Sequence, residues 1–231
     1  MAVPWYEWKN IRERLIIFGK AVQGVSPYKV IIEPDPKKCP SGYCSFTKRE
    51  IAVNPNLFEV LPKDQYQLTK AILVHEAGHR RFTSPKRLSG VVHQVANILE
   101  DERIERLMED SFAGVRWLVK KLSWALYHES EPVDGNSNSP GEVVAYFLQL
   151  RFAKRIGKKI KGSLSEKNKK LWQKIEPLVY EAWKADASEV VYQSAERIVK
   201  ILGLKEYQIP SWVKKIQDRL GSLEGKRSEE D

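Results

Sequence analysis

The chain has 231 residues, of which 42% are hydrophobic and 10% aromatic, and its formal net charge is +9. This length and apolar content are sufficient for a packed core, in one large domain or two small ones, which is typical of a globular protein. No run of about eighteen apolar residues occurs, and the N-terminus alternates charged with aromatic residues. We therefore expect a soluble, cytoplasmic protein without a membrane span.

The first predicted elements are one helix and three short strands. Apolar residues recur at intervals of three and four over residues 6–22, a period that predicts an amphipathic helix. Three short stretches of strand-forming residues follow, bounded by turn formers, at residues 28–33, 43–47 and 50–53. These stretches predict a small antiparallel or mixed sheet of about three strands.

The chain contains two cysteines, Cys39 and Cys44, and the PSGY segment between them is typical of a tight turn. A local disulfide suits this spacing, and the sequence leaves open whether it forms. Two thiols cannot complete a structural zinc site of four ligands, and the histidines lie elsewhere. We therefore expect both cysteines to be non-catalytic.

From residue 63 onward the apolar pattern is helical. Beyond a helix that ends near residue 82, helical patterns cover residues 88–108, 115–127, 142–155, 171–184, 189–202 and 211–220. The stretch at residues 131–141 is rich in turn formers and marks a boundary. The fold class is therefore α+β and mainly helical. We expect a zincin-like catalytic domain at 1–130, a helical region at 141–222 and a disordered tail at 223–231.

The sequence HEAGH at residues 75–79 matches the HExxH pattern within a predicted helix. Residues four apart lie one turn above each other, so His75 and His79 can bind one zinc ion and leave room for a third protein ligand and a water. Glu76 lies about 100° around the helix and can reach that water without being a ligand. We assign the histidines as metal ligands and Glu76 as the catalytic base.

This arrangement predicts hydrolysis of an amide bond. Zinc lowers the pKa of a bound water to about 7, and Glu76 can accept its proton during attack on a carbonyl. The metal also polarises the carbonyl and stabilises the oxyanion. A purely structural pair of histidines is the alternative interpretation. It is disfavoured because Leu68 and Ile72 place the pair on an inward face, where unpaired imidazoles are costly to bury.

An acidic cluster at residues 97–105, on the next predicted helix, is the expected source of the third ligand. On a helical wheel Glu100 lies roughly 50° from the centre of the apolar stripe, whereas Asp101 lies roughly 150° away. Arg103 lies near that centre, where its charge needs a buried carboxylate partner. We therefore choose Glu100 as the third zinc ligand. Asp101 and Glu105 remain alternative ligands or partners that orient a histidine.

The HEAGH helix, preceded by the segment REIAVNP and followed by an acidic helix, resembles the gluzincin metallopeptidases, in particular the minigluzincins. The resemblance covers about residues 1–110. It implies that the strand before the active-site helix is a sheet edge, to which an extended peptide substrate adds as a further strand through Ile51 and Val53. The family pairs a Glu ligand with an Asp four residues later, and within residues 97–105 only Asp101 and Glu105 are acidic residues at that spacing.

The sequence therefore predicts a metallopeptidase that holds one Zn²⁺ per chain and acts on a peptide or protein. One alternative is a zinc hydrolase of a non-peptide amide. Another is an HExxH-derived regulatory or binding protein that uses its C-terminal helices, with DNA as a conceivable partner of the basic residues 154–170. No aromatic residues interleave with those lysines, so we expect a solvated surface rather than a nucleic-acid site, and no membrane partner. The oligomeric state is left open.

Overall fold

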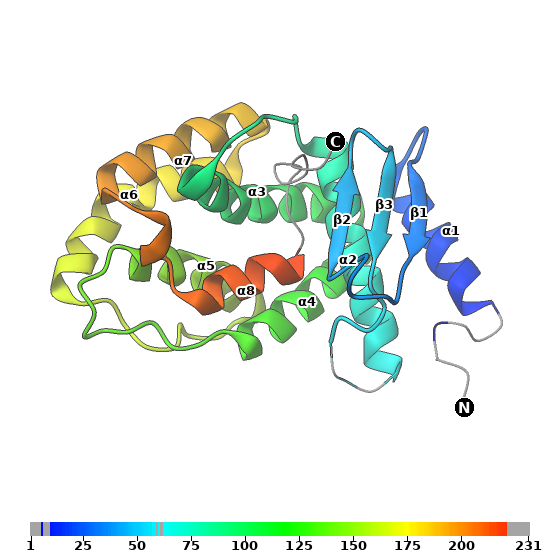
Figure 1. Cartoon of the computed structure of the whole chain (residues 1–231), viewed down its shortest axis with the longest axis horizontal. Coiled ribbons are helices and arrows are strands. Elements are labelled where there is room, and N and C mark those ends of the chain that lie inside the picture. The colour runs from blue at the N-terminus through cyan, green and yellow to red at the C-terminus, as the bar shows by residue number, and fades with distance from the viewer. Residues whose placement is uncertain (1–5, 7–9, 59, 61, 221–231) are drawn as a thin grey trace. The chain divides into compact units, whose positions relative to one another are not determined.

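The computed structural model describes residues 6, 10–58, 60 and 62–220. Over these residues the chain forms one small mixed sheet near the N-terminus and eight α-helices (Figure 1). This confirms the predicted fold class. The tail that we expected at 223–231 lies outside the described residues, as does most of the N-terminal turn of the first predicted helix. No helix of the described part is long and apolar enough to span a membrane.

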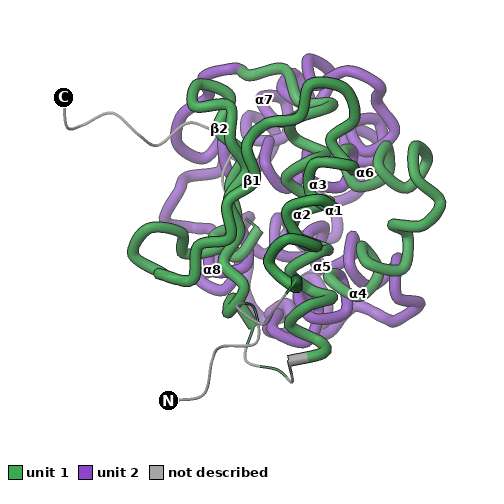
Figure 2. Tube along the Cα trace, turned by 90° about the vertical axis from the view of Figure 1, so that its right-hand side faces the viewer, with its two compact units in different colours: residues 1–85, 104–122, 218–231 green, residues 86–103, 123–217 purple. Residues whose placement is uncertain are grey.

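Two compact units divide the chain (Figure 2). Unit 1 consists of residues 1–85, 104–122 and 218–231, and unit 2 of residues 86–103 and 123–217. The division passes through helix α3 (Gly90–Ser111) and helix α4 (Arg116–Glu129), each of which begins in one unit and ends in the other. It therefore does not coincide with the turn-rich segment at 131–141 that we expected as a boundary.

Unit 1 is built on the sheet and two helices. The elements are α1 (Ile11–Gln23), β1 (Lys29–Ile32), β2 (Gly42–Ser45), β3 (Glu50–Val53) and α2 (Pro62–Phe82). The strand order is β1-β3-β2, and β3 pairs parallel with β1 and antiparallel with β2. Helix α1 packs against β1, and α2 packs against β2 and β3, so these helices cover the sheet (Figure 1).

The strand order corrects one expectation from the sequence. Ile51 pairs with Val30 on one side and with Cys44 on the other, so the backbone of β3 is already occupied at both edges. The side chains of Ile51 and Val53 are fully buried. The expectation that these two residues receive a substrate at a sheet edge is therefore wrong, because β3 pairs with both β1 and β2 and is the central strand.

Unit 2 contains most of the C-terminal helices, which match the predicted ones closely. They are α5 (Gly141–Ile156), α6 (Glu166–Lys184), α7 (Ser188–Leu202) and most of α8 (Ser211–Leu220), whose residues from 218 on belong to unit 1. Helix α6 packs against both α5 and α7 (Figure 1). The side chain of Ser165 caps the N-terminus of α6, and Gly157 ends α5 in the left-handed conformation that favours glycine. Local capping and an apolar stripe therefore define these helices.

Candidate metal centre

The HExxH residues lie in the second half of α2, a helix of 21 residues. The side chains of His75, Glu76 and His79 are 1%, 1% and 5% exposed. The two imidazole rings lie against each other, with centroids 4.9 Å apart and planes at 83°. Spacing by four residues thus brings both rings together on a buried face of the helix, as the period of an α-helix requires.

Helix α3 approaches α2 closely at Gly78. A Cβ atom placed on Gly78 would lie 3.2 Å from both Cβ and Cδ1 of Ile104 and 3.2 Å from Cγ of Met108. Any side chain larger than hydrogen would therefore separate the two helices. Glycine at this position therefore permits the close contact with α3. The close approach places the middle of α3 beside the histidines.

Each histidine is oriented through its Nδ1 atom. Nδ1 of His75 lies 3.0 Å from Oε1 of Glu105, and both side chains are 1% exposed. Nδ1 of His79 lies 3.1 Å from Oγ1 of Thr83, the residue that follows the last turn of α2. A histidine whose Nδ1 is engaged in this way presents Nε2 to a metal ion. Both rings are thus held in the orientation that a metal ligand needs.

Asp101 lies one helical turn before Glu105 on α3. His75, His79 and Asp101 are all buried, and each offers a ligand atom within 4.8 Å of those of the other two. Two imidazoles and one carboxylate form the donor set of catalytic zinc sites, which keep a further position for water. The three residues could therefore hold a metal ion, and their chemistry fits zinc better than magnesium or calcium.

The structure does not bring Glu100 to the histidines. Its carboxylate accepts hydrogen bonds from Nε of Arg103 at 2.7 Å, from Nη2 of Arg103 at 2.6 Å and from Oγ of Ser188 at 2.9 Å. Glu100 and Arg103 are both fully buried. The buried partner that Arg103 was expected to need is thus Glu100 itself. Glu100, our choice as third ligand, is therefore not in the group that could hold a metal ion, whereas Asp101, the residue we had kept as the alternative, is.

The helical wheel favoured Glu100 because α3 is buried on two faces. The face toward α2 carries residues spaced by three and four, namely Asp101, Ile104, Glu105 and Met108. Another face carries Glu100 and Arg103, which bond to Ser188 at the start of α7. A wheel that averages all apolar residues into a single stripe cannot separate two buried faces.

A buried arginine pairs with Asp101. Nη1 of Arg151, on α5, lies 3.1 Å from Oδ2 of Asp101, and the arginine side chain is 0% exposed. Nε of Arg151 also lies 3.4 Å from Oε2 of Glu102. The acidic turn of α3 is therefore anchored to α5. Sequence reasoning missed Arg151, as it missed Thr83, because no local pattern links either residue to the motif.

The catalytic base expected from the sequence lies beneath strand β2. A Cβ atom on Gly42 would lie 2.9 Å from Oε1 of Glu76 and 2.6 Å from Cγ2 of Ile72. The backbone of β2 therefore passes directly over the carboxylate. β2 is also an outer strand of the three-stranded sheet. The outer strand beside Glu76 is thus β2, and not the strand that carries Ile51 and Val53.

Cys39 and Cys44 are buried and reduced. Cys39 donates its thiol hydrogen to the carbonyl of Ser41 at 3.3 Å, and Cys44 lies within β2 rather than in a turn. Burial, reinforced by the negative charge of Glu76, raises the pKa of the Cys39 thiol to about 12. A thiol that stays protonated is a poor nucleophile. This supports the expectation that Cys39 is non-catalytic.

No protein-family model matches the sequence, and no curated protein or solved structure does so either. The site is therefore interpreted from its own geometry.

Proposed function

We propose that the protein is a zinc-dependent metallopeptidase of gluzincin type. His75, His79 and Asp101 hold the metal ion, and Glu76 is the catalytic base. The observation that supports this most is the buried group of two histidines and one aspartate, with ligand atoms within 4.8 Å of one another. Asp101 and Glu105 reproduce the four-residue spacing of the family's acidic pair, with the two residue types exchanged.

The residues around the metal have different chemical roles. Zinc, when bound, supplies a Lewis acid that polarises the scissile carbonyl and acidifies water. Glu76 accepts the proton of the attacking water and passes it to the leaving amine. Glu105 and Thr83 keep the two imidazoles in place. Because Glu76 is 1% exposed, little bulk water competes for its carboxylate.

The position of β2 favours an extended peptide as the substrate. A peptide that adds as a strand to an outer strand gains main-chain hydrogen bonds along its length. Along β2 it would run past Glu76, because Gly42 lies directly over that carboxylate. We therefore move the substrate-binding strand of the proposal from Ile51 and Val53 to β2.

The test compares wild-type protein with Glu76→Gln on a mixed peptide library, with zinc content measured on the same samples. We expect Glu76→Gln to keep its zinc and to lose hydrolysis by about 10²–10⁴-fold, because an amide cannot accept the proton. Glu13→Gln on the exposed side of α1 is the matched control and should cleave like wild type. Near-normal hydrolysis by Glu76→Gln would contradict the proposal. Turnover of non-peptide amides alone would favour the other zinc hydrolase.

A further inference from the structure

One segment of the protein has a strong excess of basic over acidic residues. Residues 154–170 contain eight basic residues and one acidic residue, so they contribute +7 of the net charge of +9. The sequence alone indicated a solvated surface, because no aromatic residues interleave with these lysines. In the structure, aromatic rings come from the two adjoining helices instead. Tyr146 on α5 and Trp172 on α6 lie with ring centroids 5.1 Å apart.

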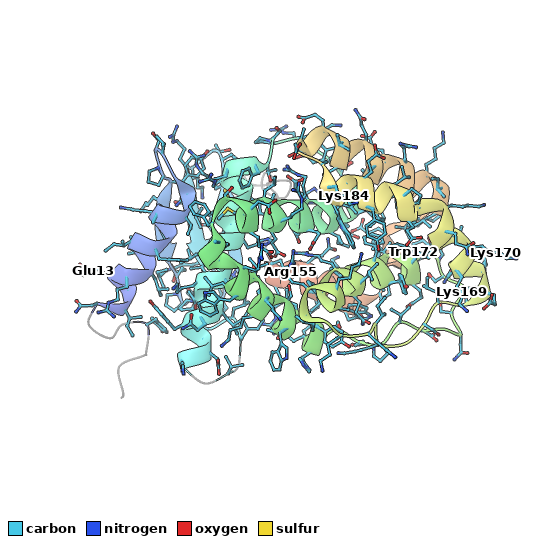
Figure 3. All side chains as sticks on the ribbon, turned by 180° about the vertical axis from the view of Figure 1, so that it is seen from behind. Glu13, Arg155, Lys169, Lys170, Trp172 and Lys184 are labelled. Atoms are coloured by element: carbon cyan, nitrogen blue, oxygen red, sulfur yellow. The ribbon has the colours of Figure 1, made fainter. Side chains whose placement is uncertain are left out.

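A cavity of about 430 Å³ lies in unit 2 next to these two rings. Four lysines also line it, namely Lys154, Lys158, Lys159 and Lys169, together with apolar side chains of α5 and of the loop that follows it. The described lining residues include neither Asp nor Glu. Figure 3 shows Trp172 turned toward the neighbouring helix, whereas Lys170 projects from the end of α6. The cavity thus combines an apolar, aromatic wall with a cationic rim.

The loop that carries part of this rim is held in one conformation. Val133 donates to the carbonyl of Lys161 at 2.9 Å and accepts from the amide of Ser163 at 3.3 Å. Gly162, between them, has φ +79°, and a Cβ atom there would lie 2.1 Å from the carbonyl oxygen of Val133. Nζ of Lys161 donates to the carbonyl of Tyr127 at 2.6 Å. The lysines beside Lys161 are therefore displayed by a fixed loop rather than by a free tail.

Two of the four rim lysines have structural partners. Lys154 donates to the hydroxyl of Tyr180 at 2.8 Å, and Lys169 pairs with Glu166 at 2.5 Å. Lys158 and Lys159 have exposed side chains and no carboxylate partner among the described residues. Both directly follow Gly157, the residue that ends α5. These two lysines are available to an anionic ligand.

We propose that this cavity binds a nucleotide, either free or as one unit of single-stranded nucleic acid. The base lies against Tyr146 and Trp172, and the phosphates lie at Lys158 and Lys159. Aromatic rings beside a cationic groove are the combination that binds single strands without reading sequence. An acidic peptide would use the lysines and leave the aromatic wall unused. A duplex keeps its bases stacked, so it would leave the cavity empty.

The test is fluorescence anisotropy of an end-labelled oligothymidylate of about fifteen nucleotides at low salt. We expect the double variant Lys158→Ala/Lys159→Ala to weaken binding about tenfold, because two phosphate contacts are lost. The control is Lys167→Ala/Lys170→Ala, which removes the same charge from exposed residues of the same segment that do not line the cavity. The control should weaken binding by less than about threefold, since only long-range attraction changes.

A second variant separates a nucleotide site from general charge attraction. Tyr146→Leu keeps an apolar side chain and should weaken oligothymidylate about tenfold while leaving polyphosphate binding unchanged. If thymidine monophosphate displaces the oligothymidylate at the same nucleotide concentration, the ligand of the cavity is a free nucleotide. If it does not, the ligand is a nucleic-acid strand. The proposal is overturned if both double lysine variants lose the same affinity for oligothymidylate or if Tyr146→Leu loses none. It is also overturned if the wild-type protein does not bind oligothymidylate. Thermal melting confirms that each variant is folded, and Glu76→Gln should bind like wild type.

Discussion

Nδ1 of His75 lies 3.0 Å from Oε1 of Glu105, and the two side chains are almost completely buried. Glu105 stands four residues after Asp101 on α3, so a single helical turn carries both a carboxylate that could hold a metal ion and the carboxylate that contacts His75. A carboxylate at Nδ1 fixes the ring and increases the basicity of Nε2.

Replacement of Glu105 should weaken zinc binding without removing any of the proposed ligands. We expect Glu105→Gln to lower zinc affinity about 10–100-fold, because the orienting carboxylate of His75 is lost. Competition with a fluorescent zinc chelator measures the affinity. Asp110→Asn, an exposed position later on the same helix, is the control and should bind like wild type. Equal affinities for Glu105→Gln and wild type would show that the contact with His75 has no role in metal binding.

Substitutions of the neighbouring residues Asp101 and Glu100 on α3 should have opposite effects on zinc binding. Asp101→Asn should lose most of the zinc and remain folded. Glu100→Gln should retain zinc binding when folded but lower the free energy of unfolding by about 3–5 kcal/mol, because Arg103 keeps a buried charge without its counterion. Zinc analysis and urea unfolding of both variants give the answer. Zinc loss in Glu100→Gln alone, with stability unchanged, would restore Glu100 as the ligand.

A methyl group at Gly42 should disturb the base and leave the ligands intact. Its Cβ would lie 2.9 Å from Oε1 of Glu76, closer than such atoms pack, so the carboxylate has to move. We expect Gly42→Ala to reduce peptide hydrolysis by about 10²-fold with zinc content unchanged, since small misplacements of a catalytic group are costly. Gly114→Ala has open space around its Cβ and serves as the control. Full activity of Gly42→Ala would show that β2 does not constrain Glu76.

The thiol of Cys39 should be unreactive until the protein unfolds. Burial and Glu76 raise its pKa to about 12 from an ordinary value of 9.0, so the thiolate fraction at pH 8 is very small. We expect no alkylation by iodoacetamide at pH 8 in buffer and full alkylation in denaturant, as read by mass spectrometry. Rapid alkylation of the native protein at Cys39 would contradict this.

The same pKa shift predicts the direction of a pH effect on stability. An unfolded chain releases the Cys39 proton near pH 9, whereas the folded chain keeps it until about pH 12. The contribution of the Cys39 thiol to the free energy of unfolding is therefore fully present below pH 9 and is lost as the pH rises toward 12. Cys39→Ser should show a smaller fall in melting temperature than wild type between pH 8 and about pH 11. An equal fall in both proteins would remove Cys39 as a cause.

Local patterns in the sequence predicted nearly all the elements and the HExxH pair. Helix periodicity located α3 and α5 to α8 within a few residues, because their apolar stripes and caps are local features. The order of the strands in the sheet could not be predicted from local patterns. Pairing of β1 with β3 depends on how the chain crosses the sheet, and no local pattern distinguishes a central from an outer strand when all three are short.

The remaining errors at the site share one physical cause, which is tertiary contact. Asp101 was displaced by Glu100 because α3 has two buried faces and only the packing on α2 decides between them. Thr83 and Arg151 contribute through contacts that depend on the fold. The signal that pointed to Asp101 in advance was the four-residue spacing to Glu105, but the helical wheel was given more weight and Glu100 was chosen.

The most direct test of the central claim is the zinc content of the purified protein and of His75→Ala and His79→Ala, measured by elemental analysis after exhaustive dialysis. We predict about one zinc per chain in wild type, and loss of most of it in each variant, because two protein ligands hold zinc far more weakly than three. Variants that bind zinc as tightly as wild type would place the metal elsewhere and contradict the account.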